Sequence, residues 1–335
     1  MIIDSFLFFQ ELKLLKIRLE YLYDVVDRFI IVEAIETFSG REKGFIFEEN
    51  KKLFKKYMDK IIYFKIEDRH NDYNSLINYL DLKNEPIYTK IKNIIKCHNY
   101  YDKREIHWLL DTYHRECIHI PLSKLCKDNY LIIFSDIDEI PDRELILDIQ
   151  NHDYPTICKH KEFKYYMNLF SNENWVGSII NTYENIENKS LNNIRIDSKK
   201  YKNFYSGGYH FTSIGGEEQL INKIESWGHQ EYNKKIIKNN LHQNIINGRD
   251  IFYRFGEPKN IIVDLDDRYF YDKKMSEIIK RNSILTLKNT NNNDIRSSFK
   301  YVFFQLIFYL IRIKDEPLKA FKKLLNKFKL KLIRM

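Results

Sequence analysis

The sequence predicts an α/β protein whose core is a mostly parallel β-sheet. Over the first 150 residues, short runs of β-branched and aromatic residues alternate with segments whose apolar residues recur at helical spacing. That alternation is typical of β–α–β units. Two of the apolar runs end directly in polar loops, at the point where parallel sheets bind ligands. We therefore expect a ligand site at this edge of the sheet.

The predicted elements follow one another closely in this first half. We expect strands over residues 2–9, 29–32, 61–64 and 130–134, and helices over 10–24, 48–58, 99–120 and 142–150. Residues 67–95 are rich in asparagine and unevenly patterned, so we expect loops with short helices there. The two polar loops at which we expect the ligand site follow Val32 and Phe134.

The pattern changes in the second half. From residue 156 onward, aromatic segments and paired glycines replace the alternation, which predicts an α+β half built onto the first. The asparagine run 289–293 predicts a surface loop and a boundary near 290. We therefore expect one domain over residues 1–290, with halves 1–150 and 151–290. A linker and basic helices would follow over 291–335.

Composition narrows the class of protein. The formal net charge of +8 suits a phosphate-bearing ligand, an anionic membrane or nucleic acid, and the basic excess is concentrated at the C-terminus. The four cysteines form no CxxC pair, which argues against a zinc site or a disulfide scaffold and favours reduced thiols in a cytoplasmic protein. Asp4, Glu11 and Lys13 interrupt the apolar N-terminus, so we expect no signal peptide or anchor there.

The segment Ser135-Asp136-Ile137-Asp138-Glu139 carries three carboxylates directly after a buried strand. Their mutual repulsion is costly unless a cation or a proton offsets it. Mg²⁺ or Mn²⁺ takes one or two protein carboxylates and completes its shell with phosphate oxygens. The alternative is a helix N-cap, in which Asp142 or Glu139 satisfies free backbone amides. Both interpretations stay open on this motif alone.

Segments along residues 1–255 resemble one known family, in the right order. They are Asp4-Ser5-Phe6 with Glu11-Leu12, Ile30-Ile31-Val32-Glu33, Thr37-x-Ser39-Gly40 with Lys43, Ser135-Asp136-Ile137-Asp138-Glu139-Ile140-Pro141, Gly207-Gly208-Tyr209-His210-Phe211 and Lys223-Ile224-Glu225-Ser226-Trp227-Gly228-His229-Gln230-Glu231. These segments look like glycosyltransferase family 17. The family includes β-1,4-N-acetylglucosaminyltransferases that add a bisecting GlcNAc to the core mannose of N-glycans, with bacterial and viral relatives.

The resemblance implies a GT-A-like fold with a C-terminal helical extension, a UDP-sugar donor such as UDP-GlcNAc, a divalent cation (Mn²⁺ or Mg²⁺) and inversion at the anomeric carbon. Residues 1–150 would then bind donor and metal, and residues 151–290 the acceptor. Because no Golgi-type anchor is expected, the acceptor would be another glycan or a lipid-linked saccharide.

The resemblance also implies roles for individual residues. Asp136 and Asp138 would hold the metal on the diphosphate, and His210 and His229 would be further metal or phosphate ligands; structural histidines are the alternative. Glu33, Thr37, Ser39 and Lys43 would contact the donor. Trp175 would stack on a sugar or pack in the core.

Two further sets of residues are predicted on helices. Arg104, Glu105 and Arg115 fall on the expected helix 99–120, where an arginine can clamp phosphate; exposed helix salt bridges are the alternative. An inverting transfer needs a general base, and the family's Gly-Gly-x-Glu pattern assigns it to Glu218, with Glu217 as the competitor. The alternative is a carboxylate favoured by the helix dipole.

The C-terminus has a pattern of its own. Residues 301–313 are too short to span a bilayer, and residues 317–335 combine apolar residues at helical spacing with many lysines. We expect a basic amphipathic helix that could attach the enzyme to an anionic membrane surface, with a plain docked helix as the alternative.

The expected function is thus a metal-dependent N-acetylglucosaminyltransferase-like enzyme. An inactive transferase-like glycan-binding protein is the first alternative. A nucleic-acid-binding module is the second, which we disfavour because the basic residues form no recognisable binding motif.

Overall fold

The computed structural model describes residues 1–315 except 267, 271 and 289–294, and these residues are organised around one nine-stranded sheet. The strands are β1 (Ile2–Phe8), β2 (Arg28–Ala34), β3 (Ile61–Ile66), β4 (Leu131–Asp136), β5 (Glu139–Ile140), β6 (Thr156–Lys164), β7 (Leu169–Thr182), β8 (Phe204–Thr212) and β9 (Ile261–Ile262). Their order is β3-β2-β1-β4-β7-β6-β8-β5, and β9 pairs with β7.

The first four strands of this order are parallel, and the remainder of the sheet is mixed. Ser5 on β1 lies opposite Ile30 on β2 and Phe134 on β4, so the three carboxyl ends meet at one edge. β7 runs antiparallel to both β4 and β6, while β6 and β8 are parallel. The α/β class is confirmed, and the parallel arrangement holds for β3-β2-β1-β4. Strands from both predicted halves share this one sheet.

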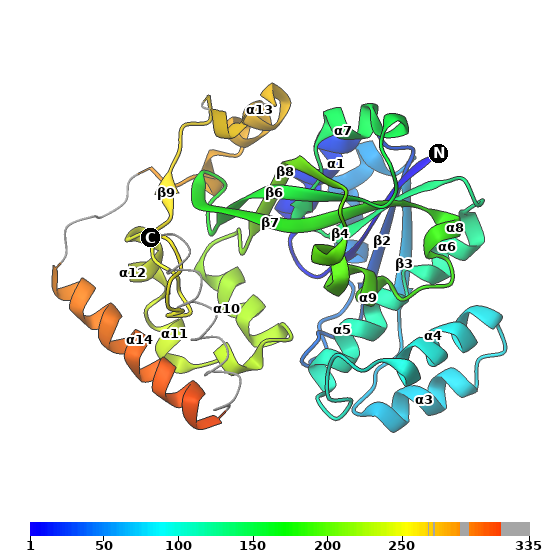
Figure 1. Cartoon of the computed structure of the whole chain (residues 1–335), viewed down its shortest axis with the longest axis horizontal. Helices are drawn as coiled ribbons and strands as arrows, with labels where there is room; N and C mark the ends of the chain where they lie inside the picture. The colour runs from blue at the N-terminus through cyan, green and yellow to red at the C-terminus, as the bar shows by residue number, and fades with distance from the viewer. Residues whose placement is uncertain (267, 271, 289–294, 316–335) are drawn as a thin grey trace.

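Helices cover both faces of the sheet (Figure 1). The α-helices are α1 (Leu12–Leu22), α2 (Ile46–Asn50), α3 (Tyr73–Asp81), α4 (Pro86–Cys97), α5 (Ile106–Glu116), α6 (His119–Leu125), α7 (Arg143–Leu147), α8 (Tyr183–Ile186), α9 (Leu191–Ile196), α10 (Glu217–Ser226), α11 (Lys235–Lys238), α12 (Leu241–Ile246), α13 (Lys273–Arg281) and α14 (Ile295–Asp315). Short 3₁₀ helices occupy Lys51–Tyr57, Ile149–Asn151, Asp197–Lys200, Gln230–Tyr232, Arg268–Phe270 and Ser283–Leu285.

The central strands are apolar on both sides because both sides are covered. Phe29 and Ile31 of β2 join the cluster formed with α1, α7 and α13, whereas Ile30 and Val32 join the cluster formed with α3, α4, α5 and α9. A strand buried on both faces needs an unbroken apolar run. This requirement explains why the sequence shows these strands so clearly.

The short helices expected within 67–95 are present, and one other helix prediction needs correction. α3 begins with a capping box between Asp72 and Ser75, and α4 begins at Pro86. The single helix expected over 99–120 is wrong, because α5 ends at Glu116 and α6 begins anew. Pro121 lies in the first turn of α6, where its missing N–H is tolerated, but it could not continue α5.

The C-terminal helices pack beside the sheet. α10, α12 and α14 enclose a third apolar cluster, and α14 lies at the outer edge of the molecule, in orange and red in Figure 1. The predicted boundary near 290 and the predicted basic helix over 317–335 fall outside the described residues. None of the described helices combines the length and the apolar character needed to cross a membrane.

Candidate active site

A cavity of about 430 Å³ opens at the edge where β1, β2 and β4 end. Its walls come from the segment after β1, the loop after β2, one side of α5, α9, and the C-terminal end of α10 with the residues that follow it. The acidic segment after β4 lies in the wall, so Asp136 and Asp138 both line the cavity. The parallel strands therefore place the polar loops together, as the sequence predicted.

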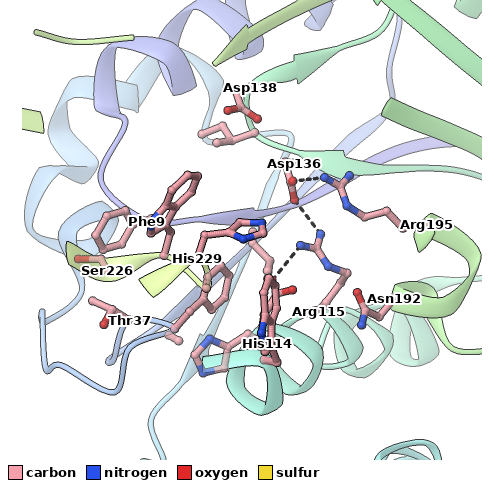
Figure 2. Close-up of a pocket in the computed structure, with 18 of the residues that line it drawn as sticks. Phe9, Thr37, His114, Arg115, Asp136, Asp138, Asn192, Arg195, Ser226 and His229 are labelled. Atoms are coloured by element: carbon pink, nitrogen blue, oxygen red, sulfur yellow. Dashed lines mark hydrogen bonds and ion pairs between the residues drawn. The ribbon is translucent and has the colours of Figure 1, made fainter. Parts of the chain in front are cut away.

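Asp136 is held between two arginines (Figure 2). Its Oδ1 accepts a hydrogen bond from Arg115 Nη1 at 2.7 Å, and its Oδ2 accepts one from Arg195 Nη2. Burial by itself would raise the pKa of Asp136, but the two guanidinium groups hold that pKa far below its usual value. Arg195 also donates to both oxygens of Glu139, at 3.0 and 2.9 Å. The cavity wall thus carries an ionised carboxylate beside two fixed cations.

Asp138 faces a third cation. Lys223 on α10 donates to Asp138 Oδ2 at 3.2 Å, and His210 Nε2 lies 3.8 Å from Oδ1. Burial lowers the pKa of Lys223, but the nearby carboxylates, Asp138 first and then Glu11 and Asp136, leave it raised. His210 lies between Asp138 and Glu162, and its ring stacks on Trp175 at 4.7 Å. Trp175 in turn donates its indole N–H to Glu139 at 2.6 Å.

A fully buried arginine holds the acidic turn in shape. Arg18 on α1 pairs with both oxygens of Asp4, at 2.6 and 2.8 Å, and donates to Ser135 Oγ at 2.7 Å. Its remaining nitrogen donates to the backbone carbonyls of residues 136, 137 and 139. Burying a guanidinium is costly unless its donors are satisfied, and here each is used. Arg18 was missed from the sequence, although it lies between Leu15 and Leu22 on the apolar face of α1.

The two aspartates fit a cation that a substrate completes. Among the described residues, no group of three or more His, Cys, Asp or Glu side chains could hold a metal by itself. Mg²⁺ and Mn²⁺ sites that act on phosphates use one or two carboxylates, with phosphate oxygens filling the shell. Asp136 and Asp138 provide that limited set on one cavity wall. His229 also lines the cavity, but it is half-exposed and pairs with Glu231 at 2.9 Å.

Aromatic rings line another part of the cavity, where Figure 2 labels Phe9, His114 and His229. Burial lowers the pKa of His114 to about 3, so its ring is uncharged, and Phe38 lies 5.6 Å from it between ring centroids. His114 Nε2, Ser226 Oγ and Trp227 Nε1 are buried and have no hydrogen-bond partner among the described residues. Unsatisfied buried polar atoms on a cavity wall are ready to bind a ligand.

The donor contacts predicted after β2 are only partly brought together. Thr37 and Lys43 line the cavity. Glu33 does not, because it is fully buried and caps α2, accepting from the backbone amides of Ile46 at 2.7 Å and Phe47 at 3.0 Å. Lys43 Nζ also donates to Glu33, at 2.6 Å. Ser39 is not part of the wall and donates to the Glu225 carbonyl.

The predicted phosphate clamp on one long helix is also corrected. Arg104 is 90% exposed, precedes α5 and pairs with Asp102 at 2.6 Å. Glu105 is exposed and precedes α5 as well, so neither residue reaches the cavity. Arg115, three turns along α5, does reach it. Arg195 on α9, which the sequence did not indicate, supplies the second guanidinium.

The two predicted bases lie away from the cavity. Glu217 and Glu218 are exposed in the first turn of α10, and Glu217 pairs with His242 at 2.6 Å. Gly215 and Gly216, both with positive φ, set the entry into this helix. The helix therefore turns its C-terminal end, with Lys223 and Ser226, toward the cavity rather than its first turn.

Comparison with known protein families gives the site a context. The family model of glycosyltransferase family 17 matches residues 1–84, from β1 through α3. This N-terminal quarter of the chain is therefore similar to glycosyltransferase family 17. A family 17 chain is a glycosyltransferase, which accords with polar groups gathered on one cavity at the ends of β1, β2 and β4. The match ends before Asp136, so the acidic segment and its arginines lie outside it. A search of curated proteins found no match.

Proposed function

We propose that this glycosyltransferase has a GT-A-like fold and moves GlcNAc from UDP-GlcNAc, with inversion, to a hydroxyl of a glycan or lipid-linked saccharide. One observation carries the proposal: Asp136, Asp138 and the cations Arg115, Arg195 and Lys223 all line the same cavity. A divalent cation, Mn²⁺ or Mg²⁺, would be held by the two aspartates and would neutralise the departing diphosphate.

The cationic side chains would bind the diphosphate directly. Arg115 and Arg195 present planar guanidinium groups, which pair with phosphate oxygens in a fixed geometry. In the structure they are paired with Asp136, which keeps them oriented toward the cavity. Stabilising negative charge where it develops is a large contribution to catalysis. Their role is therefore to orient the diphosphate and to offset its charge as it leaves.

The aromatic part of the cavity suits a nucleoside. Phe38 and the uncharged His114 offer ring surfaces, and Thr37 and Ser226 offer hydroxyl groups beside them. A pocket of mostly apolar walls with a few polar atoms is typical of small-molecule sites. We assign the nucleoside to this side, in place of the contact predicted for Glu33.

The general base needs a carboxylate that reaches the acceptor. Of the carboxylates that line the cavity, Asp136, Asp138 and Asp111 are hydrogen-bonded to basic side chains. Glu36 is buried, accepts from the His70 backbone amide at 3.2 Å and lies 3.8 Å from Arg69. Glu11 accepts from the Gln10 backbone amide at 2.9 Å and is not hydrogen-bonded to a basic side chain among the described residues. A carboxylate that is not held in a hydrogen-bonded ion pair can accept the proton of an acceptor hydroxyl. We assign the base to Glu11.

A panel of nucleotide sugars tests the proposal. Hydrolysis or transfer would be followed by released nucleoside diphosphate, with Mn²⁺ and with a chelator, and the expected result is metal-dependent release from UDP-GlcNAc. Release from none of the sugars would contradict the enzyme assignment. Binding without release would instead favour the catalytically inactive glycan-binding protein.

A further inference from the structure

The helix α14 is apolar on two opposite sides, and the described residues cover only one of them. Phe299, Val302, Phe303, Leu306 and Leu310 are between 49% and 76% exposed. Their spacing of three and four residues places them on one face of the helix. We call this set the outer face of α14. A continuous row of large exposed apolar residues normally marks an interaction surface.

The opposite side of α14 is firmly packed. Tyr301, Phe304 and Phe308 surround the ring of Tyr253, with centroids 5.1, 5.5 and 5.6 Å away. The Tyr301 hydroxyl donates to the Asp250 carbonyl at 2.9 Å, which ties the helix to the body of the protein. The outer face is therefore held in place and cannot turn inward. Whatever covers it must come from outside the described residues.

The positive charge of α14 and the segment after it distinguishes between possible partners for the outer face. Residues 295–335 contain eleven Lys and Arg and two acidic residues, a formal charge of +9, whereas the whole chain carries only +8. The basic excess of the protein thus belongs entirely to this helix and the segment that follows it. Two copies would repel each other through such segments. The phosphates of a nucleic acid would pair with the basic residues, but the apolar residues of the outer face would stay uncovered.

We propose that the outer face of α14, with the basic segment after it, docks the protein on the surface of an anionic lipid bilayer. An interfacial helix buries apolar side chains at the boundary between headgroups and acyl chains while lysines contact anionic headgroups. α14 would lie on the bilayer rather than cross it. The docking requires neither donor nor metal, so its test is independent of the proposed transfer reaction.

Vesicle sedimentation tests this docking. The full chain is mixed with phosphatidylcholine vesicles that either contain or lack phosphatidylglycerol, without donor or metal. Binding to the phosphatidylglycerol vesicles is expected, weakening as salt rises. The variant Phe303→Ser/Leu306→Ser/Leu310→Ser should bind at least about tenfold more weakly, because each large apolar side chain contributes substantially to insertion.

Two further variants complete the experiment. The control Leu53→Ser/Leu82→Ser/Ile284→Ser removes equally exposed side chains from other elements and should bind like the unaltered chain. Charge reversal in the tail, Lys322→Glu/Lys323→Glu/Lys327→Glu, should weaken binding at least about tenfold without touching the described fold. The proposal is overturned if the unaltered chain does not sediment with the anionic vesicles. It is equally overturned if the α14 variant binds like the control, or if the outer face instead mediates dimers or RNA binding without vesicle binding.

Discussion

Arg18→Met is expected to cost about 3–5 kcal/mol of the free energy of unfolding, the loss typical of breaking a buried ion pair from one side. Arg18 and Asp4 are both fully buried, and their closest atoms are 2.6 Å apart. Methionine has a similar length but no donors, so the Asp4 carboxylate and three carbonyls of the acidic turn lose their partner. Urea unfolding followed by circular dichroism measures the loss.

Two controls isolate the buried charge as the cause. Arg281→Met removes an exposed partner of Glu20 and should cost less than about 1 kcal/mol. The double variant Asp4→Asn/Arg18→Met removes the unpaired charge and should regain part of the stability lost in the single variant. A loss below about 1 kcal/mol for Arg18→Met, or a double variant no more stable than the single one, would refute this account of the turn.

Three further outcomes are expected. Gly208→Ala should cost at least about 2 kcal/mol, because φ is +81° and a Cβ would lie 2.5 Å from the Ile140 carbonyl oxygen. Burial lowers the pKa of His160 to about 3, so His160 should contribute a fall in stability of about 1.4 kcal/mol per pH unit below pH 6.5, as the unfolded chain takes up the proton. His160→Gln should remove this contribution and leave that of His114. Glu11→Gln should lower the transfer rate at least about a hundredfold, whereas Glu218→Gln should leave it near that of the unaltered enzyme.

Each of these outcomes has a result that opposes it. For Gly208→Ala, thermal unfolding unchanged within a degree would show that the backbone yields more easily than its contacts indicate. For the pH dependence, His242→Gln serves as the exposed control, and a slope equal to that of His160→Gln would contradict the assignment of the effect to burial. For the base, a larger loss from Glu218→Gln than from Glu11→Gln would return the role to α10.

The strands that build the site could be predicted because burial on both faces leaves a plain signal. β2 and β4 contain unbroken apolar runs, at 29–32 and 131–134, that end in polar residues, whereas β1 carries the buried Asp4 and Ser5 in its middle. The helices were harder, because the break between α5 and α6 depends on one proline and because the start of α3 depends on a local cap. Local signals of this kind compete with periodicity in a single sequence.

The site residues, too, could be predicted only in part from the sequence. Asp136, Asp138, Thr37, Lys43 and Arg115 line the cavity, because they follow the ends of neighbouring parallel strands or lie on the adjoining helix. The orientation of α10 could not be predicted, since it is set by packing against residues distant in sequence. The roles of Arg195 and Arg18 were missed for the same reason: each contacts the acidic turn from more than fifty residues away in sequence.

The central claim is that Asp136 and Asp138 bind a cation that holds the diphosphate of a nucleotide sugar. Isothermal titration of UDP-GlcNAc into the protein with Mn²⁺, compared with Asp138→Asn, tests it most directly. The account predicts binding that requires Mn²⁺ and that weakens at least about tenfold in the variant, the effect of losing one ligand to the cation. Equal affinity in the variant, or equal affinity without metal, would contradict it.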